Sequence, residues 1–383
     1  MMILTDVQRQ RAVEWLPAVT AGGIAWLAFL LIGDTPLVRA SGMALAIVGM
    51  TLALRSMGAM LAIIGGLALA FSPAFWIQTG GAESLEPLEV GLSLVAALIV
   101  GGLALRFSSR PFVGIALVLL VFAGLFLGVV GTPRSLRLTT LLTAWLLFLL
   151  VDGLIVSNPR PDDTTGGQIR PYHTYGILIL LFVGVLNDPL FTLLVPAIAL
   201  GLFLSNQKLA RLFWLALLAI AAFGIYGVLD IYYSPYWWHY PTDEAIARDL
   251  RHIPYLLADG WQEPRRWIGL FELIVGQFTI AGLALGILGL ARLSRWYPPV
   301  GVVTMIAFGT YAVFGLIYFG GDRPVLLLPL LMIQVLWMTY AVYTFGQWLQ
   351  KSLHWSNERV RLLAAAAFTL LPLFMLLRIV GAV

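Results

Sequence analysis

The chain has 383 residues, of which 60% are hydrophobic and 11% are charged, and its mean hydropathy is +0.93. Because soluble domains carry about 25% charged residues, this composition excludes an ordinary soluble domain and predicts an all-α, polytopic integral membrane protein. The sequence has no cysteine, which excludes disulfides and thiolate metal sites. Its net charge of +4 comes mostly from arginine in short loops, a pattern that does not indicate nucleic-acid binding.

About 13 apolar stretches are long enough to be transmembrane helices, at about 20 residues for each crossing. They lie at 17–33, 37–54, 58–76, 88–105, 112–130, 138–157, 174–186, 189–204, 211–229, 267–291, 299–319, 324–349 and 360–380. The seventh and eighth are short and are separated only by residues 187–189, so they are either two thin spans or one re-entrant hairpin. We divide this single membrane domain into an N-terminal module (1–229), an outer loop (230–266) and C-terminal helices (267–383).

Basic residues predict the orientation of these spans, because loops on the cytoplasmic side of a membrane carry an excess of Lys and Arg. One set of alternate loops holds most of them, namely Arg9, Arg11, Arg55, Arg106, Arg110, Arg160, Arg170, Lys208, Arg211, Arg292, Arg295, Lys351, Arg359 and Arg361. This side is predicted to be cytoplasmic, together with the N-terminus. The opposite, extracytoplasmic side has few basic residues in its short loops, apart from Arg134 and Arg137, and it collects nearly all of the unusual polar and aromatic motifs.

The outer loop 230–266 contains a predicted amphipathic helix that starts at Thr242, lies on the membrane interface and ends before Pro254. It is preceded by a run of aromatic residues that includes Trp237 and Trp238. These rings either form an aromatic belt at the depth of the lipid headgroups or face a cavity and stack on a sugar or headgroup.

The turn between the third and fourth spans carries the polar and aromatic residues Trp76, Gln78, Glu83 and Glu86. Pro73 is predicted to end the regular helix before them. The acidic residues either favour the dipole of the next helix, as in an ordinary loop, or line a binding site at the external interface.

Three further ionisable groups are candidates on the same side. Asp322 and Arg323 lie in a GGDRP turn at 320–324, where they either pair with each other or leave Arg323 to bind phosphate with its planar, bidentate fork. Glu272 lies a turn or two inside the tenth span, and ionisable groups inside a membrane are functional candidates by default.

On the cytoplasmic side the only comparable group is Asp152, near the end of its span. The four histidines, His173 among them, are expected in loops on both sides, and their spacing does not suit a metal site. Asp34 lies in the first external loop, where an acid is usually just solvated.

Two stretches resemble the GT-C superfamily of glycosyltransferases, which includes protein mannosyltransferase-like and lipid A aminoarabinose transferase-like enzymes. In 59–106, an apolar span ends in FSPAFW and continues through a polar turn with acids into another apolar span. In 318–337, YFGGDRPVLLLPLLMIQVLW is similar to a late span of the family. The resemblance covers about a third of the chain, and it implies an internal N-terminus, about a dozen spans and polar external loops.

The resemblance implies transfer of a sugar from a polyprenyl-phosphate carrier, a membrane lipid, to an acceptor on the extracytoplasmic face. An acid in the first external loop would be the general base or would help to hold a divalent cation, Mg²⁺ or Mn²⁺, and Asp34 is the only acid there. Basic residues would bind the carrier phosphate, and Arg323 matches the late-span basic position. The sequence departs from the family in one respect, because its first external loop has only about six residues where members usually carry a long loop with amphipathic helices.

Three functions therefore stay open. A transferase requires Asp34, the turn 78–89, Glu272 and Arg323 to converge on one external cavity that can be reached from the lipid. A non-catalytic subunit of a membrane complex would use its polar external face to bind partner subunits, and the short first loop favours this possibility. A transporter or lipid flippase would need a polar path through the membrane, which the scarcity of central charges disfavours.

Overall fold

The computed structural model describes residues 6–80, 136–158, 171–205, 209–233, 260–318, 322–354 and 356–382. These residues form helices and connecting turns without a β-strand, so the all-α prediction is confirmed for them. Several predictions fall outside the described residues, namely the spans 88–105 and 112–130, the interfacial helix after Thr242, and the site candidates Glu83, Glu86, Trp237 and Trp238.

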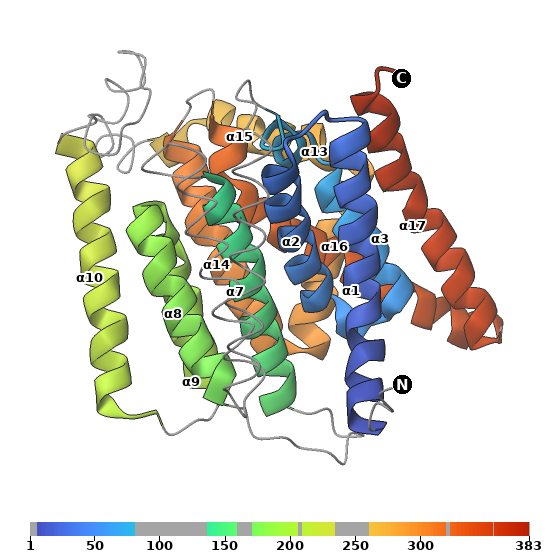
Figure 1. Ribbon diagram of the computed structural model, residues 1–383, viewed down its shortest axis with the longest axis horizontal. Helices are drawn as coiled ribbons and strands as arrows, with labels where there is room; N and C mark the ends of the chain where they lie inside the picture. Colours follow the sequence, from blue (N-terminus) through green and yellow to red (C-terminus); the bar gives the residue numbers. More distant parts are fainter. Residues whose placement is uncertain are drawn as a thin grey trace.

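The long helices pack side by side into one bundle (Figure 1). Among the described residues, seven helices are long and apolar enough to cross a membrane, as expected of a membrane-embedded protein. They are α1 (Asp6–Leu31), α7 (Leu136–Ser157), α10 (Arg211–Tyr233), α13 (Pro264–Trp296), α14 (Pro298–Ile317), α16 (Leu328–Leu353) and α17 (Asn357–Ile379). Shorter apolar helices complete the bundle: α2 (Leu37–Ala53), α3 (Ala59–Ala70), α8 (Pro171–Asn187) and α9 (Val195–Leu204). α7 and α16 are apolar and buried on nearly all sides, which makes them its central helices.

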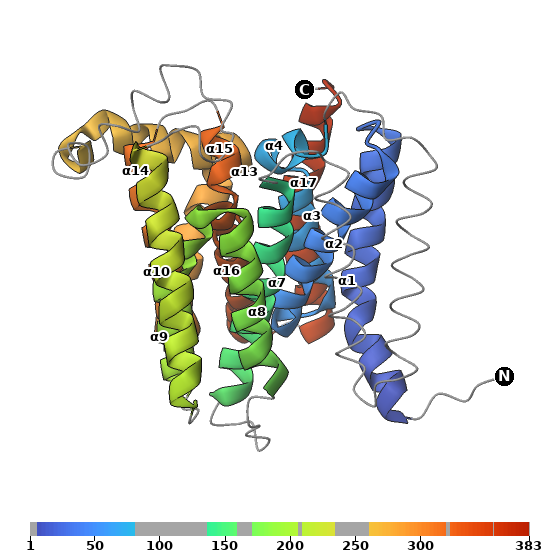
Figure 2. The ribbon, with the colours of Figure 1, turned by 60° about the vertical axis from the view of Figure 1, so that its left-hand side comes forward.

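The helices alternate in direction, so the bundle has two ends (Figures 1 and 2). The upper end carries the start of α2, the start of α7 and the short helix α4 (Pro73–Ile77), and we call it the α4 end. The lower end carries the start of α1 and the last turns of α7, which include Asp152, and we call it the Asp152 end.

Two predicted spans are each divided into a short and a long helix. The span at 58–76 is α3 followed by α4, because Pro73 lacks the N–H that would continue α3 and instead occupies the first turn of α4. The span at 324–349 is α15 (Arg323–Leu326) followed by α16. The two short helices pack against each other at the α4 end, so both breaks serve the same polar region.

The seventh and eighth predicted spans form two antiparallel passes. α8 begins beside the end of α7, where His173 contacts Asp152, and it ends near the start of α7, where Asp188 contacts Thr139. The short helix η2 (Pro189–Leu194) then reverses the direction of the chain. α9 runs back toward the end of α7, where the carbonyl of Leu204 accepts a hydrogen bond from Asn158. Both passes therefore run between the two ends of α7.

α13 is bent within the span predicted at 267–291, and the sequence analysis did not predict this break. Its backbone leaves helical geometry at Thr279, where φ is 64° and ψ is 174°. Residues before the break lie across the α4 end of the bundle, and residues after it descend along α16 (Figure 2). Glu272 precedes the break, so its exposed side chain belongs to the part of α13 that lies across the end of the bundle.

Replacing Thr279 by glycine is expected to raise the free energy of unfolding by about 1 kcal/mol. The backbone of Thr279 occupies a region that is accessible almost only to glycine, where other residues cost about 1–3 kcal/mol. Thermal unfolding in detergent would measure the change. Thr369→Gly, at an exposed site inside α17, is the matched control and should instead lose about 0.5–1 kcal/mol. A loss at both sites would contradict a strained Thr279.

Three glycines allow the second part of α13 to approach α16 closely. Gly282, Gly286 and Gly289 lie on one face, at spacings of four and three residues. A Cβ at Gly289 would lie 1.8 Å from the carbonyl oxygen of Trp337 in α16, and one at Gly286 would lie 2.0 Å from the side chain of Gln334. Small residues at helix interfaces are characteristic of membrane proteins, where close backbone packing replaces the hydrophobic effect.

Candidate functional site

Two arginines meet on one carbonyl at the α4 end of the bundle. Arg39, near the start of α2, donates from Nη1 to the oxygen of Gly80 at 2.9 Å, and Arg137, near the start of α7, donates from Nη2 to the same oxygen at 3.0 Å. Arg137 also donates from Nε to the carbonyl of Gln78 at 2.6 Å. Because both nitrogens are bonded to one oxygen, they are at most about 6 Å apart, a separation at which two unit charges repel by roughly 3 kcal/mol at an effective dielectric constant of about 20.

Gln78 supplies a buried amide beside this pair. Its Oε1 accepts a hydrogen bond from Thr140 Oγ1 at 2.8 Å, and only 5% of the residue is exposed. Its Nε2 is buried and has no hydrogen-bond partner among the described residues. A buried donor without an acceptor costs about 1–3 kcal/mol, so an anionic oxygen placed here would satisfy Gln78 and reduce the repulsion between Arg39 and Arg137.

A second pair of neighbouring arginines, Arg266 and Arg323, lies at the same end, where α15 packs against α4. Arg323, in the first turn of α15, is 7% exposed, and burial together with the nearby charge of Arg266 lowers the pKa of its guanidinium. Arg266 lies in the first turn of α13 and donates to the carbonyl of Leu316 at 2.9 Å and to Glu263 Oε2 at 2.9 Å. Four arginines, Arg39, Arg137, Arg266 and Arg323, therefore lie at the α4 end of the bundle.

Asp322 takes a partner that the sequence did not suggest. Its Oδ1 accepts a short hydrogen bond from the hydroxyl of Tyr318, the residue that follows α14. The expected partner in the GGDRP turn was Arg323, and the contact of Asp322 shown here is instead with Tyr318.

Trp76 and the loop of Asp34 lie together at this end. The Trp76 ring packs edge-on against Phe29 of α1, with ring centroids 5.5 Å apart, and a Cβ at Gly33 would lie 3.3 Å from that ring. Asp34 follows with a positive φ of 46° and an exposed side chain. Asp34 is therefore near α4, but it makes no recorded contact with the arginines.

The predicted site is thus assembled in part. Trp76 belongs to α4, Gln78 directly follows it, and Arg323 belongs to α15, which packs against it. Asp322 accepts a hydrogen bond from Tyr318, and Asp34 and Glu272 are exposed at the same end of the bundle. Arg39, Arg137 and Arg266 were missed as site residues. Arg137 could have been identified from the sequence, because it lies next to a predicted external loop whereas most other basic residues lie in predicted cytoplasmic loops.

A charged cluster that the sequence did not predict lies at the Asp152 end. Asp152 Oδ1 accepts a hydrogen bond from Arg55 Nη2 at 2.6 Å, and its Oδ2 lies 2.8 Å from His173 Nε2. Glu14 approaches Arg55 from α1 at 3.7 Å. The expectation that His173 lies in a loop is wrong, because it occupies the first turn of α8 and is 1% exposed. Asp152 does not reach solvent at its own end of the span, since its side chain is only 8% exposed.

In the described part of the chain, no group of three or more His, Cys, Asp or Glu side chains could hold a metal ion. The divalent cation that the GT-C resemblance allows therefore has no cluster of ligands among these residues. The acids Glu83 and Glu86 lie outside them.

Comparisons with known proteins give no match: no family model, no curated protein and no solved structure matches this chain. Its function is therefore inferred from the sites themselves.

Proposed function

We propose that the arginines around α4 bind the phosphate of a lipid-linked substrate. The observation that carries this proposal is the shared carbonyl of Gly80, on which Arg39 and Arg137 converge beside the unsatisfied amide of Gln78. Arg137 has only carbonyl partners among the described residues, so its charge is not neutralised by a carboxylate. Phosphate offers several anionic oxygens to guanidinium and amide donors at once.

We further propose that the protein is a GT-C-like membrane glycosyltransferase of about 13 spans, whose N-terminus and Asp152 end are cytoplasmic and whose α4 end is extracytoplasmic. In such a reaction the bond between the sugar and the carrier phosphate breaks, and a bond from the sugar to an acceptor hydroxyl forms. The departing phosphate gains negative charge, which the arginines would stabilise. The acceptor proton would pass to a carboxylate, and Asp34 is the acid that the resemblance assigns to this role.

Replacing Arg137 by glutamine is expected to weaken binding of a polyprenyl phosphate by roughly tenfold. One charge-assisted hydrogen bond contributes about 1.5–3 kcal/mol, and 1.4 kcal/mol corresponds to a factor of ten in affinity. Binding to the purified protein in lipid nanodiscs would measure the change. Arg137→Lys, which keeps the charge, should retain part of the affinity. Arg211→Gln, at an exposed arginine of α10, is the matched control and should bind as the wild type does. Equal binding by Arg137→Gln and wild type would contradict the phosphate site.

The assignment of Asp34 is tested separately. Asp34→Asn should abolish sugar transfer while leaving carrier binding unchanged, because Asp34 makes no recorded contact with the arginines. Transfer that persists in Asp34→Asn would remove Asp34 as the base without removing the phosphate site.

A non-catalytic subunit is the second candidate. It is favoured by the exposure of both Asp34 and Glu272, and by the short connection between α1 and α2, which leaves no room for a helix at that point. This candidate predicts that the purified chain alone transfers no sugar. It also predicts that mutation of these exposed acids weakens co-purification of a partner membrane subunit.

A further inference from the structure

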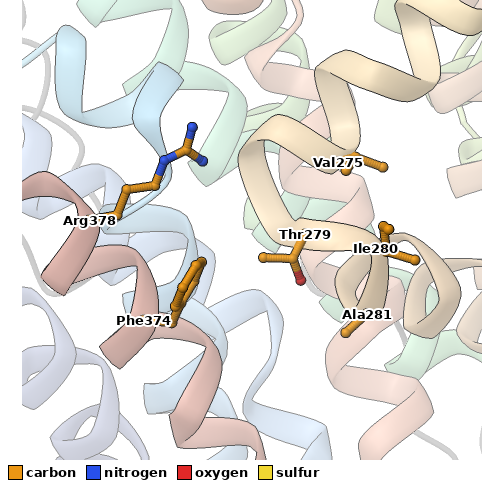
Figure 3. Close-up of a pocket in the computed structure, with 6 residues that line it drawn as sticks. All are labelled: Val275, Thr279, Ile280, Ala281, Phe374 and Arg378. Carbon is orange, nitrogen blue, oxygen red and sulfur yellow. The ribbon is translucent and has the colours of Figure 1, made fainter. Parts of the chain in front are cut away.

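The break in α13 creates a groove between that helix and α17. The groove has a volume of about 520 Å³ and is lined by Val275, Thr279, Ile280, Ala281, Phe374 and Arg378. Figure 3 shows the α13 residues on one side and Phe374 and Arg378, from successive turns of α17, on the other. A straight α13 would not produce this shape, because the groove lies where the chain turns at Thr279.

Arg378 is held at one end of the groove by the broken helix. Its Nη1 donates to the carbonyl oxygen of Gly276 at 3.0 Å. This is its only recorded hydrogen bond, and no carboxylate within ion-pair distance is recorded for it among the described residues. A guanidinium has five N–H donors, so an exposed Arg378 retains donors and a full charge for an anion.

The rest of the groove is apolar and faces outward. Ile280 is 74% exposed and Phe374 is 39% exposed, and both belong to helices that are long and apolar enough to cross a membrane. Side chains of this kind on the outside of a membrane bundle face hydrocarbon. Arg378 lies in the last turn of α17, at the α4 end, and Phe374 lies one turn further from that end. The groove thus places a cation near the end of a span and apolar walls below it.

We propose that this groove binds one anionic phospholipid, with its phosphate on Arg378 and an acyl chain along Phe374 and Ile280. The occupant is a membrane lipid because a soluble anion would gain nothing from the apolar walls, and a neutral hydrocarbon would gain nothing from the cation. A volume of this size lies in the range of about 300–1,000 Å³ that is typical of small-molecule sites. The proposal does not depend on the phosphate site around α4, which uses different residues.

The test is lipid binding by the full chain in nanodiscs that contain phosphatidylcholine with a minor fraction of phosphatidylglycerol. After the protein is released from the nanodiscs, native mass spectrometry measures which lipids it retains. Arg378→Gln is expected to lower the retained phosphatidylglycerol by roughly tenfold, because a charge-assisted hydrogen bond is lost. Arg378→Lys should keep most of the selectivity. Ala281→Trp should fill the groove and displace the lipid while leaving the cation in place.

Arg359→Gln is the matched control, because Arg359 is an exposed arginine at the opposite end of the same helix. The proposal is overturned if Arg378→Gln retains as much phosphatidylglycerol as the wild type, or if Arg359→Gln loses as much as Arg378→Gln. It is also overturned if the wild type retains the two lipids in proportion to their supply. If Ala281→Trp does not fold, the comparison of glutamine and lysine at position 378 still decides the result.

Discussion

Replacing Arg55 by glutamine is expected to lower the free energy of unfolding by about 3 kcal/mol or more. The Asp152 carboxylate is nearly buried, and Arg55 is the permanent cation on its Oδ1, at 2.6 Å. Removing one partner of a buried ion pair typically costs about 3–5 kcal/mol, because the other charge stays buried without compensation. Arg55 also lies over the Phe148 ring, 5.5 Å from its centroid, so the variant loses this cation–π contact as well.

Two further variants separate the charge effect from simple loss of packing. The double variant Arg55→Gln with Asp152→Asn carries no buried unpaired charge, so it should be more stable than Arg55→Gln alone. Glu14→Gln removes the outer, half-exposed partner of Arg55 and should cost less than about 1 kcal/mol. Thermal unfolding in detergent measures all three. A double variant as unstable as Arg55→Gln would show that the charge on Asp152 does not cause the loss.

The sequence predicted the long apolar helices well, because membrane spans have a simple rule of length and hydropathy. α2 and α7, for example, begin and end within two residues of their predicted spans. The same rule could not locate the break in α13, because Gly276, Gln277 and Thr279 can all be accommodated inside a continuous apolar helix. The break is accompanied by tertiary contacts, such as the bond from Arg378 to Gly276, which joins segments about a hundred residues apart.

The candidate site was predicted only where local sequence was unusual. Gln78 and Arg323 stood out because polar residues interrupt apolar spans there. Arg39 did not stand out, because a single arginine near the end of a span is ordinary. Its importance comes from a tertiary contact, in which Arg39 and Arg137 both donate to the carbonyl oxygen of Gly80. Likewise, His173 and Asp152 are 21 residues apart in sequence and come together only because α8 runs back along α7.

The two ends of the bundle differ in how their charged side chains are paired. At the Asp152 end, the buried carboxylate has both a permanent cation and a histidine on its two oxygens, as a structural cluster requires. At the α4 end, Arg39 and Arg137 converge on the carbonyl of Gly80, and the buried amide nitrogen of Gln78 has no acceptor among the described residues. A neutralised cluster stabilises a fold, whereas two cations that converge beside a buried amide donor attract an anionic ligand, so the α4 end is the better candidate for function.

Replacing Gly289 by alanine is expected to lower the free energy of unfolding by about 3 kcal/mol. The added Cβ would lie 1.8 Å from the carbonyl oxygen of Trp337, and a helix backbone cannot move aside as a flexible side chain can. Overpacking of a close interface costs about 1–3 kcal/mol and occasionally more. α16 is also fastened to α14 by the bond from Trp337 Nε1 to Thr304 Oγ1 at 3.0 Å, so moving it away from α13 would disturb a second interface.

Gly309 in α14 provides the matched control, since a Cβ there would meet open space. Gly309→Ala should be neutral or stabilising by up to about 1 kcal/mol, because alanine is the better helix former. The difference between the two variants therefore isolates the approach of α13 to α16 from the general effect of removing a glycine. If Gly289→Ala were as stable as Gly309→Ala, the two helices could not be packed backbone against backbone.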